Sequence, residues 1–217
     1  MYKGIIFDLD GTLLDTLESI SYSANRALIK CGLKPHPKEC YKNFAGDGQE
    51  NLILRSLHAA GDTRFKLYED VMKEYRSLFV EDCTYKVKPY DGIVDLLESA
   101  KSQGLKLAVL SNKADANVRY IIDTVFGKDK IDYVLGAKST YARKPSREGI
   151  DIVLDQLHLK VDECIYVGDT DTDMLTGRGA GIFTIGVTWG FRDERELKEG
   201  GADVIVSHPQ DIIKFLN

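Results

Sequence analysis

Short apolar runs rich in β-branched residues occur at the start of the chain and recur through its second half. Each run is nearly continuous and ends in polar residues, which is typical of parallel strands that are buried on both faces. We predict strands at Gly4 to Leu9, Leu105 to Leu110, Tyr133 to Leu135, Cys164 to Val167, Phe183 to Val187 and Asp203 to Val206.

Helix-like stretches separate these runs. They lie at Gly92 to Gln103, Asn117 to Phe126, Arg147 to Leu157 and Glu194 to Lys198. Alternation of strand and helix is typical of an α/β fold in which helices connect parallel strands. The pattern therefore predicts a Rossmann-like open parallel sheet.

The pattern changes between Thr16 and about Lys86. Apolar residues there recur at helical spacing and no convincing strand is present. The clearest examples are Leu17, Ile20, Ala24 and Leu28, then Leu67, Val71, Tyr75 and Leu78. We predict a small α-helical cap domain inserted after the first strand, with residues 16–86 forming the cap and residues 1–15 and 87–217 the α/β catalytic core.

Composition narrows the classes of protein. The chain has 217 residues, of which 43% are hydrophobic, so it can bury a core of ordinary size. Its net charge of -5, with Lys and Arg dispersed, makes nucleic acid an unexpected partner. The four cysteines form no C-x-x-C pair, and no apolar run suits a membrane span or a leader. We expect a cytoplasmic protein with no membrane partner; the oligomeric state is not predictable from this sequence.

Acidic residues follow the first predicted strand. Asp8 and Asp10 are two positions apart, so their side chains leave an extended strand on the same side, and Gly11 allows a sharp turn. Two carboxylates at one strand end favour a bound cation. The alternative is a solvated turn, because a lone D-x-D has little specificity among 34 acidic residues.

Two further segments carry groups that suit an anion. Ser111 and Asn112 follow the second core strand, where an N-cap for the next helix is the alternative interpretation. Lys144 precedes Pro145 in a polar segment, and taken alone it could be an ordinary exposed lysine.

A second acidic run, Asp169 to Asp173, follows the strand at Cys164 to Val167. Alternating acids there offer oxygen ligands for a hard cation. A calcium loop also begins with D-x-D-x-D, but Met174 occupies its glycine position and Ala180 its closing glutamate position. The run therefore favours a metal site at a strand end.

Four motifs now occur in a characteristic order: DLDGT from Asp8, a serine with Asn112, Lys144 with Pro145, and GDxxxD from Gly168. Together they resemble the haloacid dehalogenase superfamily of phosphatases over essentially the whole chain. The turn at Gly46 to Gly48, the Ser111-Asn112-Lys113 segment and the stretch from Gly186 to Gly190 are similar to phosphoglycolate phosphatases. Arg147 stands where many relatives carry a second proline.

The resemblance implies a mechanism and a set of site residues. Asp8 would attack phosphorus and Asp10 would serve as general acid and base. Mg²⁺ would be the cofactor. The phosphate would contact Gly11, Thr12, Ser111, Asn112 and Lys144, and the metal would be held by Asp8, Asp10 through its backbone carbonyl, Asp169 and Asp173. Asp171 would be a helix N-terminal acid.

The resemblance also implies a small phosphorylated metabolite as substrate, with phosphoglycolate as the first guess. Arg55 and the turn at Gly46 to Gln49 would contact its leaving group from the cap. Two alternatives stay open: a phosphomutase of the β-phosphoglucomutase type, which would share the core residues, and a non-catalytic protein that carries a phospho-aspartate as a binding or regulatory signal.

Overall fold

A computed structural model describes residues 1–216 and divides the chain into two compact units. The α/β unit consists of Met1–Asp15 and the chain from Lys88 onward, and the helical unit consists of Thr16–Val87. The helical unit is thus an insertion into the α/β unit.

The α/β unit is built on a six-stranded parallel sheet in the order β5-β4-β1-β6-β7-β8. All six predicted strands are present, which confirms the predicted fold class. Residues of β1 lie opposite both central neighbours, so that Ile5 pairs with Leu107 and Ile165. The strands are β1 (Gly4–Phe7), β4 (Lys106–Ala114), β5 (Tyr133–Ala137), β6 (Cys164–Gly168), β7 (Phe183–Val187) and β8 (Val204–Val206).

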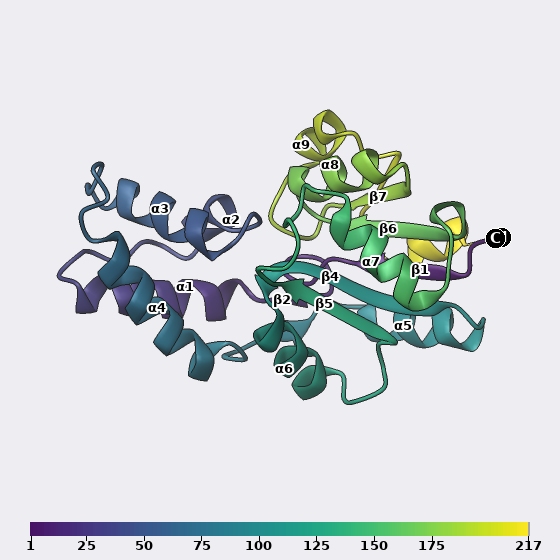
Figure 1. Cartoon of the computed structure of the whole chain (residues 1–217), viewed down its shortest axis with the longest axis horizontal. Coiled ribbons are helices and arrows are strands. Elements are labelled where there is room, and N and C mark those ends of the chain that lie inside the picture. Colours follow the sequence, from purple (N-terminus) through teal and green to yellow (C-terminus); the bar gives the residue numbers. More distant parts are fainter. Residues whose placement is uncertain (217) are drawn as a thin grey trace. The chain divides into compact units, whose positions relative to one another are not determined.

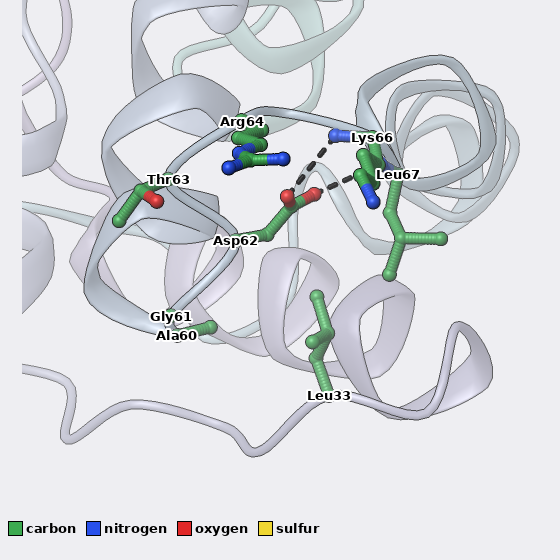
Figure 2. Close-up of a pocket in the computed structure, with 8 residues that line it drawn as sticks. All are labelled: Leu33, Ala60, Gly61, Asp62, Thr63, Arg64, Lys66 and Leu67. Atoms are coloured by element: carbon green, nitrogen blue, oxygen red, sulfur yellow. Dashed lines mark hydrogen bonds between the residues drawn. The ribbon is translucent and has the colours of Figure 1, made fainter.

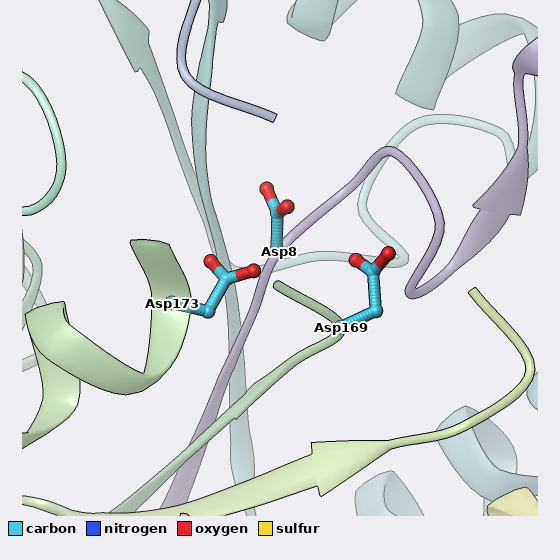
Figure 3. Close-up of side chains that lie close together, drawn as sticks. All are labelled: Asp8, Asp169 and Asp173. Carbon is cyan, nitrogen blue, oxygen red and sulfur yellow. The ribbon is translucent and has the colours of Figure 1, made fainter. Parts of the chain in front are cut away.

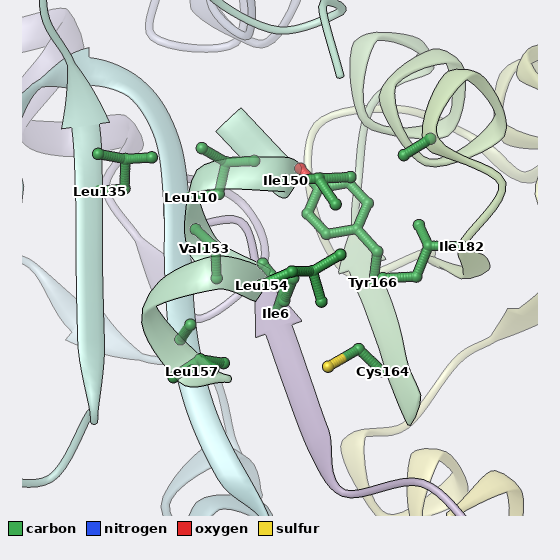
Figure 4. Packing of buried hydrophobic residues seen from close by; sticks show 12 residues of the cluster. Ile6, Leu110, Leu135, Ile150, Val153, Leu154, Leu157, Cys164, Tyr166 and Ile182 are labelled. Carbon is green, nitrogen blue, oxygen red and sulfur yellow. The ribbon is translucent and has the colours of Figure 1, made fainter. Parts of the chain in front are cut away.

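Helices cover both faces of this sheet (Figure 1). One buried cluster, under α7, joins Ile150, Val153 and Leu157 to strand residues such as Ile6 and Leu110 (Figure 4). Arg147 precedes α7 without disrupting it. The helices are α5 (Ile93–Ser102), α6 (Asp115–Val125), α7 (Glu148–Leu157), α8 (Asp171–Ala180) and α9 (Glu194–Gly200), with 3₁₀ segments η1 (Val161–Glu163) and η2 (Pro209–Phe215).

The helical unit contains α1 (Leu17–Lys30), α2 (Cys40–Phe44), α3 (Gln49–Ala59) and α4 (Tyr68–Asp82). Its helices pack through their apolar faces, and the fully buried Tyr41 donates a hydrogen bond of 2.7 Å to Asn25 Oδ1. The short helix α2 was not predicted. Across the described residues of both units, every helix is too short or too polar to cross a bilayer.

A two-residue ladder lies where the chain passes between the units. In it, β2 (Leu14–Asp15) pairs antiparallel with β3 (Lys88–Pro89), so that Asp15 lies opposite Lys88. Beside it, the Tyr90 N–H donates to the Leu13 carbonyl. The two ends of the insertion are therefore held next to each other by backbone pairing within the α/β unit.

Candidate active site

Three carboxylates meet at the carboxyl ends of β1 and β6. Asp8 follows β1, Asp169 follows β6, and Asp173 lies in the first turn of α8. The strands are paired in register up to Phe7 and Val167, so the residues that follow them are neighbours. All three acids are buried, and each offers an oxygen within 4.8 Å of the others (Figure 3). The structure thus brings Asp8 together with two acids that lie more than 160 positions later in the chain.

Lys144 is the cation of this cluster. Its side chain is 1% exposed, and its Nζ lies 2.9 Å from Asp8 Oδ1 and 2.7 Å from Asp173 Oδ1. Asp8 Oδ1 is buried and, among residues 1–216, has no partner in good hydrogen-bond geometry, so its contact with Lys144 is chiefly electrostatic. Burial raises the pKa of Asp8 to about 7, although Lys144 acts in the opposite direction.

Asp169 is held by two donors. The Thr12 hydroxyl donates to its Oδ1 at 2.8 Å, and the Phe191 N–H donates to its Oδ2 at 2.8 Å. Burial, together with the charges of Asp173 and Asp8, raises its pKa well above the usual range. Gly11 and Gly190 leave room for it, since a Cβ at either position would approach within 2.4 Å of the Asp169 side chain.

Asp173 has both carboxylate oxygens committed to donors. Its Oδ1 accepts hydrogen bonds from Lys144 Nζ and from the Tyr166 hydroxyl, each at 2.7 Å. Its Oδ2 accepts from the Thr170 N–H at 3.0 Å and from the Thr170 hydroxyl at 2.6 Å. Burial opposes ionisation of this acid, but Lys144 and these donors outweigh it and lower the pKa. Asp173 therefore stays charged as the counter-ion of Lys144.

The polar end of β4 supports the same lysine. Asn112 donates from Nδ2 to the Lys144 carbonyl at 3.1 Å and accepts from the Lys144 N–H at 3.0 Å, which fixes the backbone on both sides of that residue. Ser111 is buried beside it, and its hydroxyl accepts from the Lys113 N–H at 3.3 Å.

Asp10 is not one of the three clustered carboxylates, although it is near enough for its charge to act on Asp8. Its Oδ1 is paired with Lys113 Nζ at 2.5 Å. The turn after it depends on Gly11, whose φ is +85° and whose N–H donates to the Leu14 carbonyl. This backbone conformation lets Asp8 and Asp10 leave one loop in different environments.

The composition of the cluster fits a hard divalent cation. The cluster holds three buried carboxylates beside the Lys144 ammonium, and burial, together with the charges of the neighbouring acids, raises the pKa of Asp8 and of Asp169. Carboxylate oxygens are the ligands that Mg²⁺ prefers. Asp8 and Asp169 are the better placed ligands, because the oxygens of Asp173 already accept four hydrogen bonds.

The residues considered in the helical unit have partners within that unit. Arg55 forms a two-pronged ion pair with Asp47, with both N to O distances 2.6 Å, and also donates to the Phe44 carbonyl. It therefore braces the turn at Gly46 to Gln49.

An open hollow of about 620 Å³ lies over the connection between α3 and α4 (Figure 2). Asp62 at its edge accepts from the N–H groups of Lys66 and Leu67, at 3.1 and 2.9 Å, and so closes the connecting loop. Asp62 thus has a local structural function in this loop.

Comparison with known proteins identifies the family. A family model described as haloacid dehalogenase-like hydrolase matches residues 5–187. The chain belongs to this family. A phosphoglycolate phosphatase of Aquifex aeolicus is 30% identical over 213 residues, which are 98% of this chain and 96% of that protein. A phosphoglycolate phosphatase of Rhodospirillum rubrum is 29% identical and covers 89% of this chain and 83% of its own length.

Solved structures agree with this assignment to the haloacid dehalogenase-like hydrolases. A chain from Lactobacillus delbrueckii, provisionally assigned as a phosphoglycolate phosphatase, has a TM-score of 0.92 at 31% identity and covers 99% of this chain and 98% of its own. A predicted phosphoglycolate phosphatase of Haemophilus somnus has the same TM-score at 25% identity, covering 100% of this chain and 98% of its own. The protein is therefore a hydrolase with this family's fold.

Several groups that form hydrogen bonds or ion pairs at this haloacid dehalogenase-like site were not predicted from the sequence. Tyr166 looked like an ordinary apolar strand residue, and the Phe191 N–H carries no side-chain signal at all. The Trp189 indole, which was assigned no role, donates to the Thr12 carbonyl at 3.0 Å. Lys113 was named in the segment after Ser111, but the sequence did not predict its ion pair with Asp10, which the fold reveals.

Proposed function

We propose that the protein is a Mg²⁺-dependent phosphatase that hydrolyses a small phosphorylated metabolite through an aspartyl-phosphate. The observation that carries the proposal is the placement of Asp8, a buried carboxylate whose Oδ1 lies 2.9 Å from Lys144 Nζ within a cluster of acids. A carboxylate nucleophile needs nearby positive charge to approach a phosphate dianion, and this cluster offers both an ammonium and ligands for a divalent ion.

Asp8 and Asp10 would share the chemistry. An Asp8 oxygen forms a bond to phosphorus while the bond from phosphorus to the ester oxygen breaks. Asp10, once it has taken up a proton, gives this proton to the leaving oxygen. Water then attacks phosphorus, Asp10 takes a proton from it, and the bond to Asp8 breaks to release inorganic phosphate. Two easier displacements thereby replace one difficult hydrolysis.

Lys144 and Ser111 would hold the non-bridging phosphate oxygens while charge develops on them. Gly11, Thr12 and Asn112 were also predicted to contact phosphate. Their hydrogen bonds run to the Leu14 carbonyl, to Asp169 and to the Lys144 backbone. We assign these three residues to shaping the loops around the phosphate.

The ligands we assign to Mg²⁺ are the carboxylates of Asp8 and Asp169 and the backbone carbonyl of Asp10. Asp173 would not bind the ion directly but would act on the site through Lys144 and bound water. When bound, the ion neutralises the cluster and the phosphate oxygens so that the two anions can approach. Thr12 and Phe191, which hold the two Asp169 oxygens, would keep that ligand in place.

Phosphoglycolate is the substrate we would test first, because curated relatives that match nearly the full chain carry the name phosphoglycolate phosphatase. We assign residues 16–86 as the cap that selects the leaving group. Arg55 and Asp47 would act there by fixing the turn at Gly46 to Gln49.

The test is phosphate release from a panel of phosphorylated metabolites and p-nitrophenyl phosphate, with Mg²⁺ or with EDTA. We expect release that needs Mg²⁺ and that falls at least about 10⁴-fold in Asp8→Asn, which cannot form the aspartyl-phosphate. A folded, Mg²⁺-loaded protein that releases phosphate from no ester would refute the proposal. Transfer between positions of a phosphosugar, without net release, would favour the phosphomutase alternative.

A further inference from the structure

Tyr166 connects the hydrophobic core of the α/β unit to the candidate active site. Its side chain is fully buried in the cluster under α7, among Ile150, Leu154 and Ile182 (Figure 4). The hydroxyl donates a hydrogen bond of 2.7 Å to Asp173 Oδ1. A phenylalanine would fill the same apolar space, so packing alone does not call for a hydroxyl here.

The oxygen that receives this hydrogen bond also receives one from Lys144. Lys144 Nζ lies 2.7 Å from Asp173 Oδ1 and 2.9 Å from Asp8 Oδ1, so the ammonium is shared between the two acids. The other Asp173 oxygen is fixed by the N–H and hydroxyl of Thr170. The Tyr166 hydroxyl thus competes with Lys144 Nζ as a donor to Asp173 Oδ1.

This competition affects which of the two acids the Lys144 ammonium interacts with more strongly. With two donors at Oδ1, the negative charge of Asp173 is partly satisfied by the phenol, and Lys144 is left to interact with Asp8. A tyrosine hydroxyl keeps its proton at neutral pH, so the group stays a donor in the working range of an enzyme. Without the hydroxyl, Asp173 would draw the ammonium toward itself.

We propose that Tyr166 is a positioning residue that acts through Asp173 to keep the Lys144 ammonium directed at Asp8 and at the phosphate that Asp8 receives. The catalytic consequence rests on the phosphatase function proposed above. The effect of Tyr166 on the position of Lys144, and so on phosphate binding, does not depend on whether the protein turns over a substrate.

The variant that tests this is Tyr166→Phe, which removes one oxygen and keeps the ring. We expect kcat/KM to fall about 10-fold and the dissociation constant of inorganic phosphate, measured by calorimetry with Mg²⁺, to rise by about the same factor. Tyr41→Phe is the matched control, because Tyr41 is equally buried and its hydroxyl also donates at 2.7 Å, to Asn25 in the helical unit. It should lose a similar amount of thermal stability and keep kcat/KM and phosphate affinity within about twofold of the wild type.

A double-mutant cycle then asks whether Tyr166 acts through Lys144. In a Lys144→Met background, Tyr166→Phe should weaken phosphate binding by less than about twofold further. A loss that is as large without Lys144 as with it overturns the proposal, and so does a Tyr166→Phe protein that matches the wild type in rate and phosphate affinity. If the wild type hydrolyses no ester, the proposed function fails, whereas the phosphate titrations still decide the positioning role.

Discussion

Lys113 Nζ lies 2.5 Å from Asp10 Oδ1, and the two side chains are only 8% and 15% exposed. The ion pair ties the acid in the loop after β1 to a cation that is fixed on β4. A carboxylate that must meet the leaving oxygen of a substrate has to be held in one direction, and a sequestered ion pair provides such restraint. Lys113 thus supports Asp10 in the same way that Asp173 supports Lys144.

Replacing Lys113 should therefore affect esters according to their leaving groups. In Lys113→Met we expect kcat for alkyl phosphates to fall about 10- to 100-fold, because an alkoxide needs the proton from Asp10. With p-nitrophenyl phosphate, whose leaving group departs without a proton, kcat should fall less than about threefold. Steady-state kinetics on both esters measure the ratio.

Lys138→Met is the control for this prediction, since Lys138 is also paired with an acid, Asp115 at 3.3 Å, which is not one of the clustered carboxylates. It should leave both rates near those of the wild type. An equal loss for alkyl and aryl esters in Lys113→Met would show that Lys113 does not act through proton transfer.

The acidic cluster should make the metal-free protein less stable as the pH rises. Burial raises the folded-state pKa of Asp8 from 3.8 to about 7 and that of Asp169 well above its usual range, so the folded state holds more protons than the unfolded chain between about pH 4 and 7. Stability contributed by these protonated acids is present below pH 4 and is lost as the pH rises through the folded-state values. The lowered pKa of Asp173 has the opposite effect on the pH dependence of stability, but it concerns one acid against two.

Thermal unfolding in EDTA at pH 5.5 and pH 8 measures this effect. We expect a lower Tm at pH 8, by about 5 °C or more, and a larger gain from Mg²⁺ at pH 8 than at pH 5.5. Asp8→Asn removes one of the repelling charges, so it should raise the Tm at pH 8 in EDTA. A Tm in EDTA that increases from pH 5.5 to pH 8 would contradict the account.

Gly190 should be essential for metal affinity because of its small size. A Cβ there would lie 2.3 Å from Asp169 Oδ2 and 2.4 Å from the Gly11 carbonyl, so Gly190→Ala must displace one of them. We expect the Mg²⁺ concentration for half-maximal activity to rise at least about 10-fold. Gly179→Ala is the control: a Cβ at this position in α8 meets no atom within 4 Å, and alanine favours helix.

Asn112 should act on the rate through the backbone of Lys144. Asn112→Asp keeps the acceptor for the Lys144 N–H but replaces the donor to the Lys144 carbonyl by a second carboxylate oxygen. We expect kcat/KM to fall about 10-fold or more, together with a lower Tm. Asn25→Asp is the control, because Asn25 makes the same two hydrogen bonds, at 2.9 and 2.8 Å, to the backbone of His36 in the helical unit. It should lower the Tm without a comparable loss of rate.

The fold was predictable where one physical signal dominates. Buried parallel strands require short apolar runs, and all six runs form strands. The ends were less predictable. β4 continues through the polar residues Asn112 and Lys113 to Ala114, and the side chains of Asn112 and Lys113 bond to the Lys144 backbone and to Asp10. The ladder of Leu14 and Asp15 with Lys88 and Pro89 is too short to leave a pattern.

The clustered residues were predictable as motifs, three acids near strand ends and one lysine in a polar segment, and the structure brings Asp8, Asp169, Asp173 and Lys144 together. The direction of each polar group was not predictable. Thr12 was expected at the phosphate, and its hydroxyl donates to Asp169. Such choices depend on loop conformation, and backbone donors such as the Phe191 N–H leave no trace in the side-chain pattern.

The pairing of β2 with β3 makes the helical unit exchangeable. Because Asp15 and Lys88 lie opposite each other, the inserted segment begins and ends at neighbouring positions, and the chain of the α/β unit continues on either side of it. A segment of different length or shape could be inserted between these two positions without a change in the distance between Asp15 and Lys88. Evolution and protein engineering can therefore replace the part we assign to substrate selection while the machinery at Asp8 stays in place.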